Sequence, residues 1–377
     1  MGRRRFVQSN RVRPAPPVLS LATLEQTSRS LAAFGLANVH LTSRLNLSLG
    51  GRYTADEKDY SIDARVFSNG VLVPPSSFAD IYSDSWDTFT PRAALEYEPN
   101  DDILVYGTYS TGYKAGGYNS RGTVRENVGP YDPETVDAFE LGLKSDLFDR
   151  SVQLNLAAFL NKYSDLQSSV TKQGAVRAEN VTVNVASAET YGIEADLLTK
   201  PARNLTLGLS AGWLKAEYTD FCEDIDGVFT DGTAEPGQCA PATEIIANGA
   251  PTGTFRVPID NAGLPLSNSP EWSASIRADY EVPLSFGYIS LHADARYTSR
   301  YNTWGRAVDD AFYRDEVVLV NANVAIAEHE DGWRLSIYGR NLTNQDVLSG
   351  ATKAGANPIL QFYLPPREWG AELGFKF

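Results

Sequence analysis

The amino-acid sequence predicts an all-β protein, an antiparallel β-barrel that spans a membrane. Three observations support this prediction: side chains alternate between apolar and polar along many segments, aromatic residues gather at the ends of these segments, and short connections alternate with long ones. All three are expected of bacterial outer-membrane barrels, which are apolar outside and polar inside and have short turns on one side of the membrane.

The alternation has a period of two residues. Between Ile289 and Tyr297 every second residue is apolar, and the residues between them, from Ser290 to Arg296, are polar. The same pattern recurs at 272–280, 205–213, 333–340 and 45–52. A period of two places side chains on opposite faces of a strand. A soluble β-sandwich alternates as well, so the other two observations are needed to favour a barrel.

About thirteen strands are expected, and many of them exceed the roughly 5 to 6 residues usual in globular sheets. A tilted strand that crosses a bilayer needs roughly 9 to 11 residues. Aromatic residues at the strand ends suit two interfacial belts: Tyr53, Tyr97, Trp213, Tyr280, Tyr297, Trp333 and Trp369. The expected strands lie near residues 28–40, 44–58, 85–98, 102–114, 134–146, 150–164, 180–199, 203–220, 270–282, 286–300, 315–328, 332–343 and 367–377.

The connections alternate strictly in length. The short ones are 42–44, 99–101, 147–149, 201–203, 283–285 and 329–331, and the long ones are 59–84, 115–133, 164–179, 221–269, 301–314 and 344–366. We therefore expect the short turns to be periplasmic and the long loops to be extracellular. An odd strand count, where single-chain bacterial barrels have an even one, indicates part of a larger barrel. Residues 1–26 are predicted to be an irregular segment that is not a plug.

Composition excludes several other classes of protein. The formal net charge is −14 and no cluster of lysine and arginine recurs, so a nucleic-acid partner is not expected. No apolar stretch is long enough for a transmembrane helix. The three histidines, His40, His292 and His329, are scattered, and no catalytic, metal-binding or phosphate-binding pattern is present. We therefore expect neither an enzyme nor a bound metal or cofactor.

The two cysteines, Cys222 and Cys239, flank a polar stretch rich in glycine and aspartate. In an oxidising compartment they are expected to close a disulfide around this loop. The alternative is a pair of unrelated buried thiols.

Several segments resemble TonB-dependent receptors, the ligand-gated uptake barrels of Gram-negative outer membranes. The similar segments are LNLSLGGRYT at 45–54, DILVYGTYSTGYKAGG at 102–117, YDPETVDAFELGLK at 131–144, YGIEAD at 191–196 and GRNLTN at 339–344. The final strand, 369–377, with Leu373, Phe375 and Phe377 on its apolar face, resembles the signal that outer-membrane assembly machinery reads. The resemblance covers roughly residues 28 to 377.

The resemblance implies a fold and a function. It implies that residues 27–377 form the C-terminal portion of the barrel, about 13 of 22 strands, without the plug domain. The parent protein would be a monomer in outer-membrane lipid. It would import a scarce small ligand such as a ferric siderophore, driven by the TonB–ExbB–ExbD energy-transducing system through the missing plug. The alternatives are a truncated, non-functional remnant of such a receptor and a passive porin-like channel.

Aromatic residues in the outer loops are candidates for ligand contact. Side chains of this kind over the mouth of a barrel suit a planar ligand such as a metal chelate. The candidates are Tyr113, Tyr118, Tyr301, Trp304 and Tyr313. The alternative for each is a place in an interfacial belt or in the packing of a loop.

Overall fold

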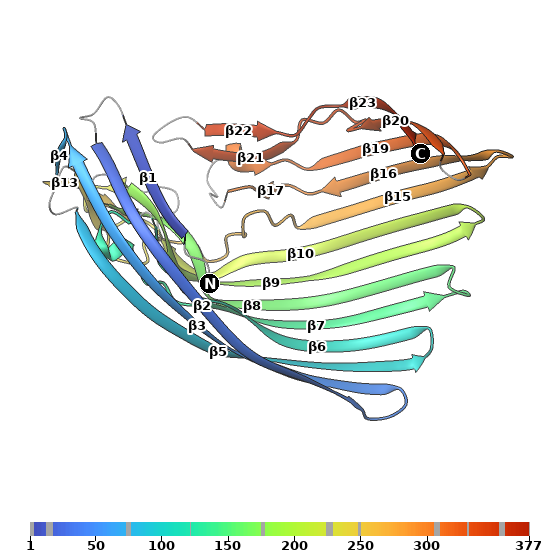
Figure 1. Ribbon diagram of the computed structural model, residues 1–377, viewed down its shortest axis with the longest axis horizontal. Coiled ribbons are helices and arrows are strands. Elements are labelled where there is room, and N and C mark those ends of the chain that lie inside the picture. Colours follow the sequence, from blue (N-terminus) through green and yellow to red (C-terminus); the bar gives the residue numbers. More distant parts are fainter. Residues whose placement is uncertain are drawn as a thin grey trace.

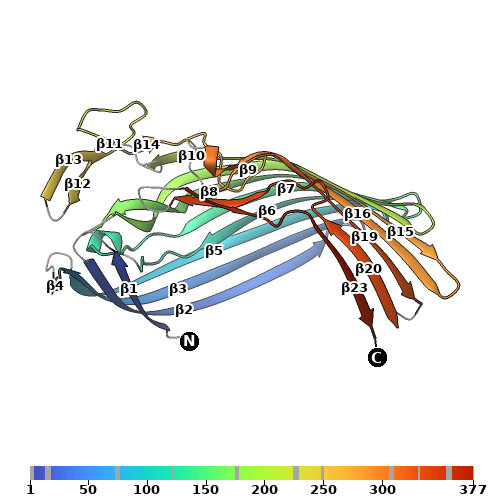
Figure 2. The same cartoon turned by 90° about the horizontal axis from the view of Figure 1, so that it is seen from above.

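One large antiparallel sheet dominates the computed structural model (Figures 1 and 2), which describes residues 4–12, 18–72, 77–120, 122–174, 178–223, 229–247, 250–304, 310–329, 332–353 and 359–376. Fourteen of its 16 strands follow one another in chain order. These are β1 (Arg4–Val12), β2 (Val18–His40), β3 (Leu45–Ser68), β5 (Phe78–Asn100), β6 (Ile103–Lys114), β7 (Glu134–Leu147), β8 (Val152–Gln173), β9 (Ala178–Ala202), β10 (Leu205–Glu223), β15 (Trp272–Pro283), β16 (Gly287–Thr298), β19 (Val317–Glu328), β20 (Trp333–Arg340) and β23 (Glu368–Phe375).

The smaller elements all lie in the long connections. Beside the main path, β4 (Val71–Leu72) pairs with β3 and β14 (Ile259–Asp260) pairs with β10. Three separate small sheets contain β11 (Phe229–Thr230), β13 (Ala250–Arg256) and β12 (Thr243–Ala247); β17 (Tyr301–Asn302) and β18 (Tyr313–Arg314); and β21 (Leu348–Lys353) and β22 (Ile359–Tyr363). Two 3₁₀ turns are η2 (Arg125–Asn127) and η3 (Asp310–Phe312). Over the described ranges, no helix is long and apolar enough to cross a bilayer.

The sheet curves like part of a cylinder, with its N-terminal and C-terminal strands at the two ends of the arc (Figure 2). All the strands expected from the sequence are present, and each pairs with its neighbours in the chain. The predicted antiparallel wall is therefore confirmed. Among the described residues no plug domain is seen inside this wall.

Two of the expected long loops, 59–84 and 164–179, are mostly strand. β3 continues to Ser68 and β5 begins at Phe78, while β8 continues to Gln173 and β9 begins at Ala178. The expectation of loops there is wrong. In these stretches the antiparallel ladder continues past the bilayer, where neither face of a strand needs to be apolar. The apolar alternation on the lipid-facing side is therefore lost: in β3 the apolar residues Tyr60, Ile62, Ala64 and Val66 alternate on the opposite, lumenal side, where they are buried.

The N-terminal part also differs from the expectation of an irregular segment over residues 1–26. β1 pairs with the first part of β2, from Arg4 opposite Gln26 to Val12 opposite Val18. The β1–β2 hairpin lies on the same side as the long loops, beyond the alternating part of β2. Its sequence therefore lacks a membrane pattern although its backbone is extended.

The two faces of the wall differ in chemistry. On one face Leu209 pairs with Ile276 and Ile276 with Ala295, and the side chains of Leu209 and Ile276 are 45% and 55% exposed. The opposite face carries Ser275 opposite Arg296 in the same pair of strands. Charged side chains in lipid are costly, so the apolar face contacts lipid and the polar face contacts the lumen.

Aromatic residues border the apolar face at both ends. Toward the long loops, Tyr191 packs edge-on against Trp213 at 5.8 Å between ring centroids, and Trp213 lies 6.4 Å from Trp272. Toward the short turns, Tyr280 pairs with Leu205, the first residue of β10, and Tyr97 pairs with Leu45, the first residue of β3. This arrangement matches two interfacial belts, one at each membrane surface.

The sheet has two edges within the described part of the chain. β2 pairs with β3 along its length, but with β1 only as far as Gln26, so residues 27–40 have a neighbour on one side only. At the other end β23 pairs with β20 alone among the described strands. Both edges run through the zone of the apolar face.

The turn lengths predict the orientation of the chain in the membrane. A cysteine introduced at Ala262, an exposed residue of the long connection 221–269, should react with a membrane-impermeant thiol reagent on intact cells. A cysteine at Arg203, in the short turn between β9 and β10, should react only after the outer membrane is permeabilised. The protein without introduced cysteines is the control. Labelling of Arg203→Cys but not Ala262→Cys on intact cells would reverse the topology.

Candidate functional site

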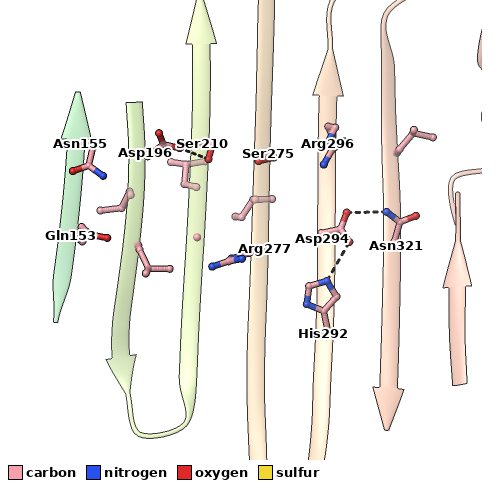
Figure 3. Close-up of a pocket in the computed structure, with 16 residues that line it drawn as sticks. Gln153, Asn155, Asp196, Ser210, Ser275, Arg277, His292, Asp294, Arg296 and Asn321 are labelled. Atoms are coloured by element: carbon pink, nitrogen blue, oxygen red, sulfur yellow. Dashed lines mark hydrogen bonds and ion pairs between the residues drawn. The ribbon is translucent and has the colours of Figure 1, made fainter. Parts of the chain in front are cut away.

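A polar surface lines the lumenal face of the wall (Figure 3). The side chains come from six consecutive strands of the sheet, β8, β9, β10, β15, β16 and β19, and occupy alternate positions, so they all point to one side. They border a shallow hollow lined by Gln153, Asn155, Asp196, Ser210, Ser275, Arg277, His292, Asp294, Arg296 and Asn321.

Many of these side chains bind one another across the strands. His292 Nδ1 lies 2.6 Å from an Asp279 carboxylate oxygen, and its Nε2 lies 3.4 Å from an Asp294 carboxylate oxygen. Asn321 donates a hydrogen bond of 2.9 Å to the other oxygen of Asp294. These hydrogen bonds and ion pairs link the polar side chains of neighbouring strands. The polar groups of the inner wall that are not used in them face the lumen.

Three of the five candidate ligand-contact residues lie together in one outer loop. Tyr301 and Tyr313 belong to the paired strands β17 and β18, and the ring of Trp304 lies 4.8 Å from that of Phe312. The short β17–β18 ladder explains this proximity because it closes the connection between β16 and β19.

Two arginines that the sequence analysis did not single out join this loop. The Arg300 guanidinium lies 4.1 Å from the centroid of the Tyr313 ring, and it forms ion pairs with Asp310 at 2.6 Å and Asp315 at 3.4 Å. Arg314 donates a hydrogen bond of 3.1 Å to the Tyr301 hydroxyl. Each arginine directly adjoins a candidate tyrosine in the sequence, and this neighbourhood could have identified both arginines as further candidates for ligand contact.

The other two candidates, Tyr113 and Tyr118, lie elsewhere. Tyr113 is at the outer end of β6, and its hydroxyl is buried without a hydrogen-bond partner in the described part of the structure. Tyr118 is only 7% exposed, and its ring stacks on Tyr60 at 5.1 Å. Burial, together with the hydrogen bond that Tyr118 donates to Asp84, raises the pKa of Tyr118. The burial of Tyr118 argues against direct contact with a ligand.

The structure joins Cys222 and Cys239, which are 17 positions apart in the sequence, by a disulfide. Cys222 stands opposite Asp260 of β14, and the Cys239 amide donates a hydrogen bond of 3.2 Å to the carbonyl of Pro258. Two interior parts of the connection, at Cys239 and at 258–260, are thereby fastened to the end of β10. No group of three or more His, Cys, Asp or Glu side chains that could hold a metal occurs among the residues described.

The oxidised state of this pair in the exported protein stays a prediction. Protein purified without reductant should gain no alkyl group when treated with an alkylating reagent under denaturing conditions, and it should gain two after reduction. Intact mass measurement distinguishes these states directly. Two alkyl groups on the non-reduced protein would show that both thiols are free.

The predicted assembly signal lies on the edge strand β23. Leu373 pairs with Leu335 and Phe375 with Trp333, and the side chains of Leu373 and Phe375 are 57% and 61% exposed on the apolar face. Phe377 lies outside the described residues. The role of this strand in assembly stays a prediction.

Comparison with known proteins identifies the wall. Residues 3–342 match the family described as TonB dependent receptor-like, beta-barrel. The chain belongs to the TonB-dependent receptor family. The pesticin receptor of Yersinia enterocolitica is 24% identical over 307 residues, which are 78% of this chain and 42% of that receptor. The probable TonB-dependent siderophore receptor PiuA of Acinetobacter baumannii is 22% identical over 75% of this chain and 33% of its own length.

Solved structures of an uptake receptor and of a metal transporter show the same fold. The ferric yersiniabactin uptake receptor FyuA from Yersinia pestis superposes with a TM-score of 0.73 at 17% identity, over 96% of this chain and 47% of FyuA. The copper transporter OprC gives a TM-score of 0.63 at 14% identity. This chain spans less than half the length of FyuA and of the pesticin receptor.

Proposed function

We propose that this chain is the C-terminal part of the barrel wall of an outer-membrane receptor that imports a ferric siderophore by TonB-dependent transport in a Gram-negative bacterium. The observation that carries the proposal is the wall itself, with an apolar outer face and a polar inner face, which matches less than half of FyuA. The names of several relatives, among them FyuA and PiuA, refer to siderophores or their uptake. Such a protein is a receptor and transporter, not an enzyme.

Two features support the idea that further strands complete the barrel. The chain corresponds to 42% of the pesticin receptor, and β2 and β23 are edge strands in the described structure. In hydrocarbon an unpaired backbone edge is costly, so a spanning sheet must close. We propose that the missing strands and a plug come from the rest of the receptor. Contact with the TonB–ExbB–ExbD system would be made by that plug.

The outer loop 299–315 is the proposed ligand-contact region. It combines the aromatic rings of Tyr301, Trp304 and Tyr313 with the guanidinium group of Arg314. Arg314 Nε is buried and has no hydrogen-bond partner within the described residues. Aromatic faces and a guanidinium group together suit a flat, anionic metal chelate.

The test is a chimaeric receptor in which this chain follows the plug and the first strands of the A. baumannii receptor PiuA. Uptake of radioactive ferric siderophore is measured in cells with and without TonB, after surface labelling has shown that the chimaera is inserted. The proposal predicts uptake that requires TonB. Uptake that is independent of TonB would indicate a passive channel instead. An inserted chimaera without any uptake would indicate a non-functional remnant.

A further inference from the structure

The connection between β6 and β7 does not project freely from the wall. Residues 115–133, here called the strap, contact β5 on one side and β9 on the other, and the strands β6, β7 and β8 lie between these two in the sheet. The strap touches the face of β5 that carries Asp80 and Asp84, the same face as Arg92 farther along the strand. It therefore runs across the lumenal side of the wall, near the mouth.

On the side of β3 and β5, the strap is held by stacked tyrosines. The Tyr118 ring lies parallel to that of Tyr60 at 5.1 Å and tilted to that of Tyr82 at 5.6 Å. Tyr60 and Tyr118 lie in one buried cluster with Val128, and the partly buried Tyr82 packs against it. The Tyr118 hydroxyl donates to the Asp84 carboxylate. Burial of this cluster raises the pKa of Tyr60 to about 12.

An ion pair adds a second attachment to β5. Arg125 of the strap binds Asp80 with an Nε to carboxylate distance of 2.7 Å, and its guanidinium also lies 5.2 Å from the centroid of the Phe78 ring. The Asp80 side chain is 25% exposed, so solvent partly screens this pair.

On the side of β9, a side chain of the strap bonds to the backbone of β9 as a neighbouring strand would. The Asn119 side chain accepts a hydrogen bond of 2.8 Å from the Thr182 amide and donates one of 2.9 Å to the Thr182 carbonyl. The Glu179 carboxylate, in a residue only 6% exposed, accepts hydrogen bonds from the Thr123 amide at 2.9 Å and from the Asn127 side chain at 3.1 Å.

Both ends of the strap are fixed as well. The Gln167 side chain of β8 donates hydrogen bonds to the carbonyl of Ala115 at 3.1 Å and to the carbonyl of Asp132 at 3.0 Å. At Gly116 a Cβ atom would overlap the carbonyl oxygen of Tyr131 and the ring of Trp86. The glycine at this position of the segment 102–117 is therefore required by the close approach of the strap to the wall.

We propose that the strap is a permanent brace that holds the outer ends of β3, β5 and β9 at one separation, so that this side of the mouth does not open when a ligand enters. A lid that moves has few buried contacts and readily exchanged hydrogen bonds. The strap instead has buried polar groups with partners on both sides, and each of these would lose its partner if the strap moved away. The strap then takes no part in any movement that admits a ligand. The inference does not depend on the identity of the ligand.

The test uses amide hydrogen exchange of the chimaeric receptor described above, in which the barrel can close, folded in lipid vesicles, followed by mass spectrometry of peptides that contain Thr182. Tyr118→Ala removes an attachment to β3 and β5, yet Thr182 is on β9. If the strap is one rigid brace, exchange at Thr182 should accelerate about 10- to 100-fold, the range expected when a well-made buried hydrogen bond opens. The matched control is Tyr109→Ala. It also removes a tyrosine that donates to an aspartate and packs on an aromatic ring, but it lies away from the strap.

A second pair of variants guards against a general loss of folding. Asp80→Asn breaks the ion pair to Arg125 of the strap, while Asp63→Asn breaks a similar exposed pair to Arg65 within β3. Asp80→Asn should accelerate exchange at Thr182 about twofold, because an exposed pair contributes little, and Asp63→Asn should leave it unchanged. Exchange at Thr182 that is unaffected by both Tyr118→Ala and Asp80→Asn overturns the proposal. So does equal acceleration by either variant and its control.

Discussion

Cells that produce only Met1–Phe377 behind a signal peptide should show no energy-dependent uptake of any ferric chelate. Within the residues that the structure describes, the edge of β2 over residues 27–40 and the edge of β23 have no partner, and both lie in the zone of the apolar face. Each unsatisfied backbone group there costs several kcal/mol in hydrocarbon, and spanning sheets therefore close on themselves. The proposed transport also needs the plug, through which TonB would act.

The measurement is accumulation of radioactive iron in a host that lacks its own siderophore receptors. A full-length receptor made in the same host is the positive control, and collapse of the proton gradient separates active uptake from leakage. Accumulation that depends on energy in cells with this chain alone would refute the prediction. It would also require another account of how the wall closes and how energy reaches it.

Leu291→Arg should destabilise the wall by roughly 2 to 4 kcal/mol if the position is near the bilayer midplane. Leu291 is on the apolar face of β16 and 38% exposed, so an arginine there must lie in lipid. Ser290→Arg, one residue earlier, places the same side chain on the lumenal face, where water and polar neighbours can accept it. Its effect should be clearly smaller.

The two variants form their own control because strand, depth and introduced residue are almost the same. Urea titration of the chimaeric receptor folded into lipid vesicles, followed by tryptophan fluorescence, gives the two changes in the free energy of unfolding. Equal changes would mean that the assignment of faces in β16 is wrong. A larger effect at Ser290 would reverse it.

The sequence was informative where lipid imposes a pattern and uninformative where it does not. In the membrane zone of β16, each side chain must suit either lipid or water, so alternation from Ile289 to Tyr297 marks the strand clearly. In β1, and in the outer parts of β3, β5, β8 and β9, no such requirement holds. These strands owe their conformation to pairing with a neighbour, which no single segment reveals.

The candidate site shows the same division. Tyr301, Trp304 and Tyr313 belong to one connection, 301–314, which the β17–β18 ladder closes, and the pairing of the only two cysteines could be proposed from their number and setting. The contact of Thr123 with Glu179 joins residues 56 positions apart through a carboxylate that looks like any other surface charge in the sequence. Only the curvature of the sheet brings the strap to β9.

The continuation of the strands beyond the bilayer determines how far the barrel wall projects above the membrane surface. β9 contains 25 residues, whereas roughly 11 suffice to cross the hydrocarbon. The remainder is a paired ladder of about 45 Å at 3.3 Å per residue, or some 30 Å of elevation at a tilt near 45°. A collar of this height carries the mouth above the layer of lipid headgroups. An antibody that approaches this part of the mouth would therefore meet the paired strands of β8 and β9 above the headgroups, and an epitope mapped on these strands should keep its shape on the living cell.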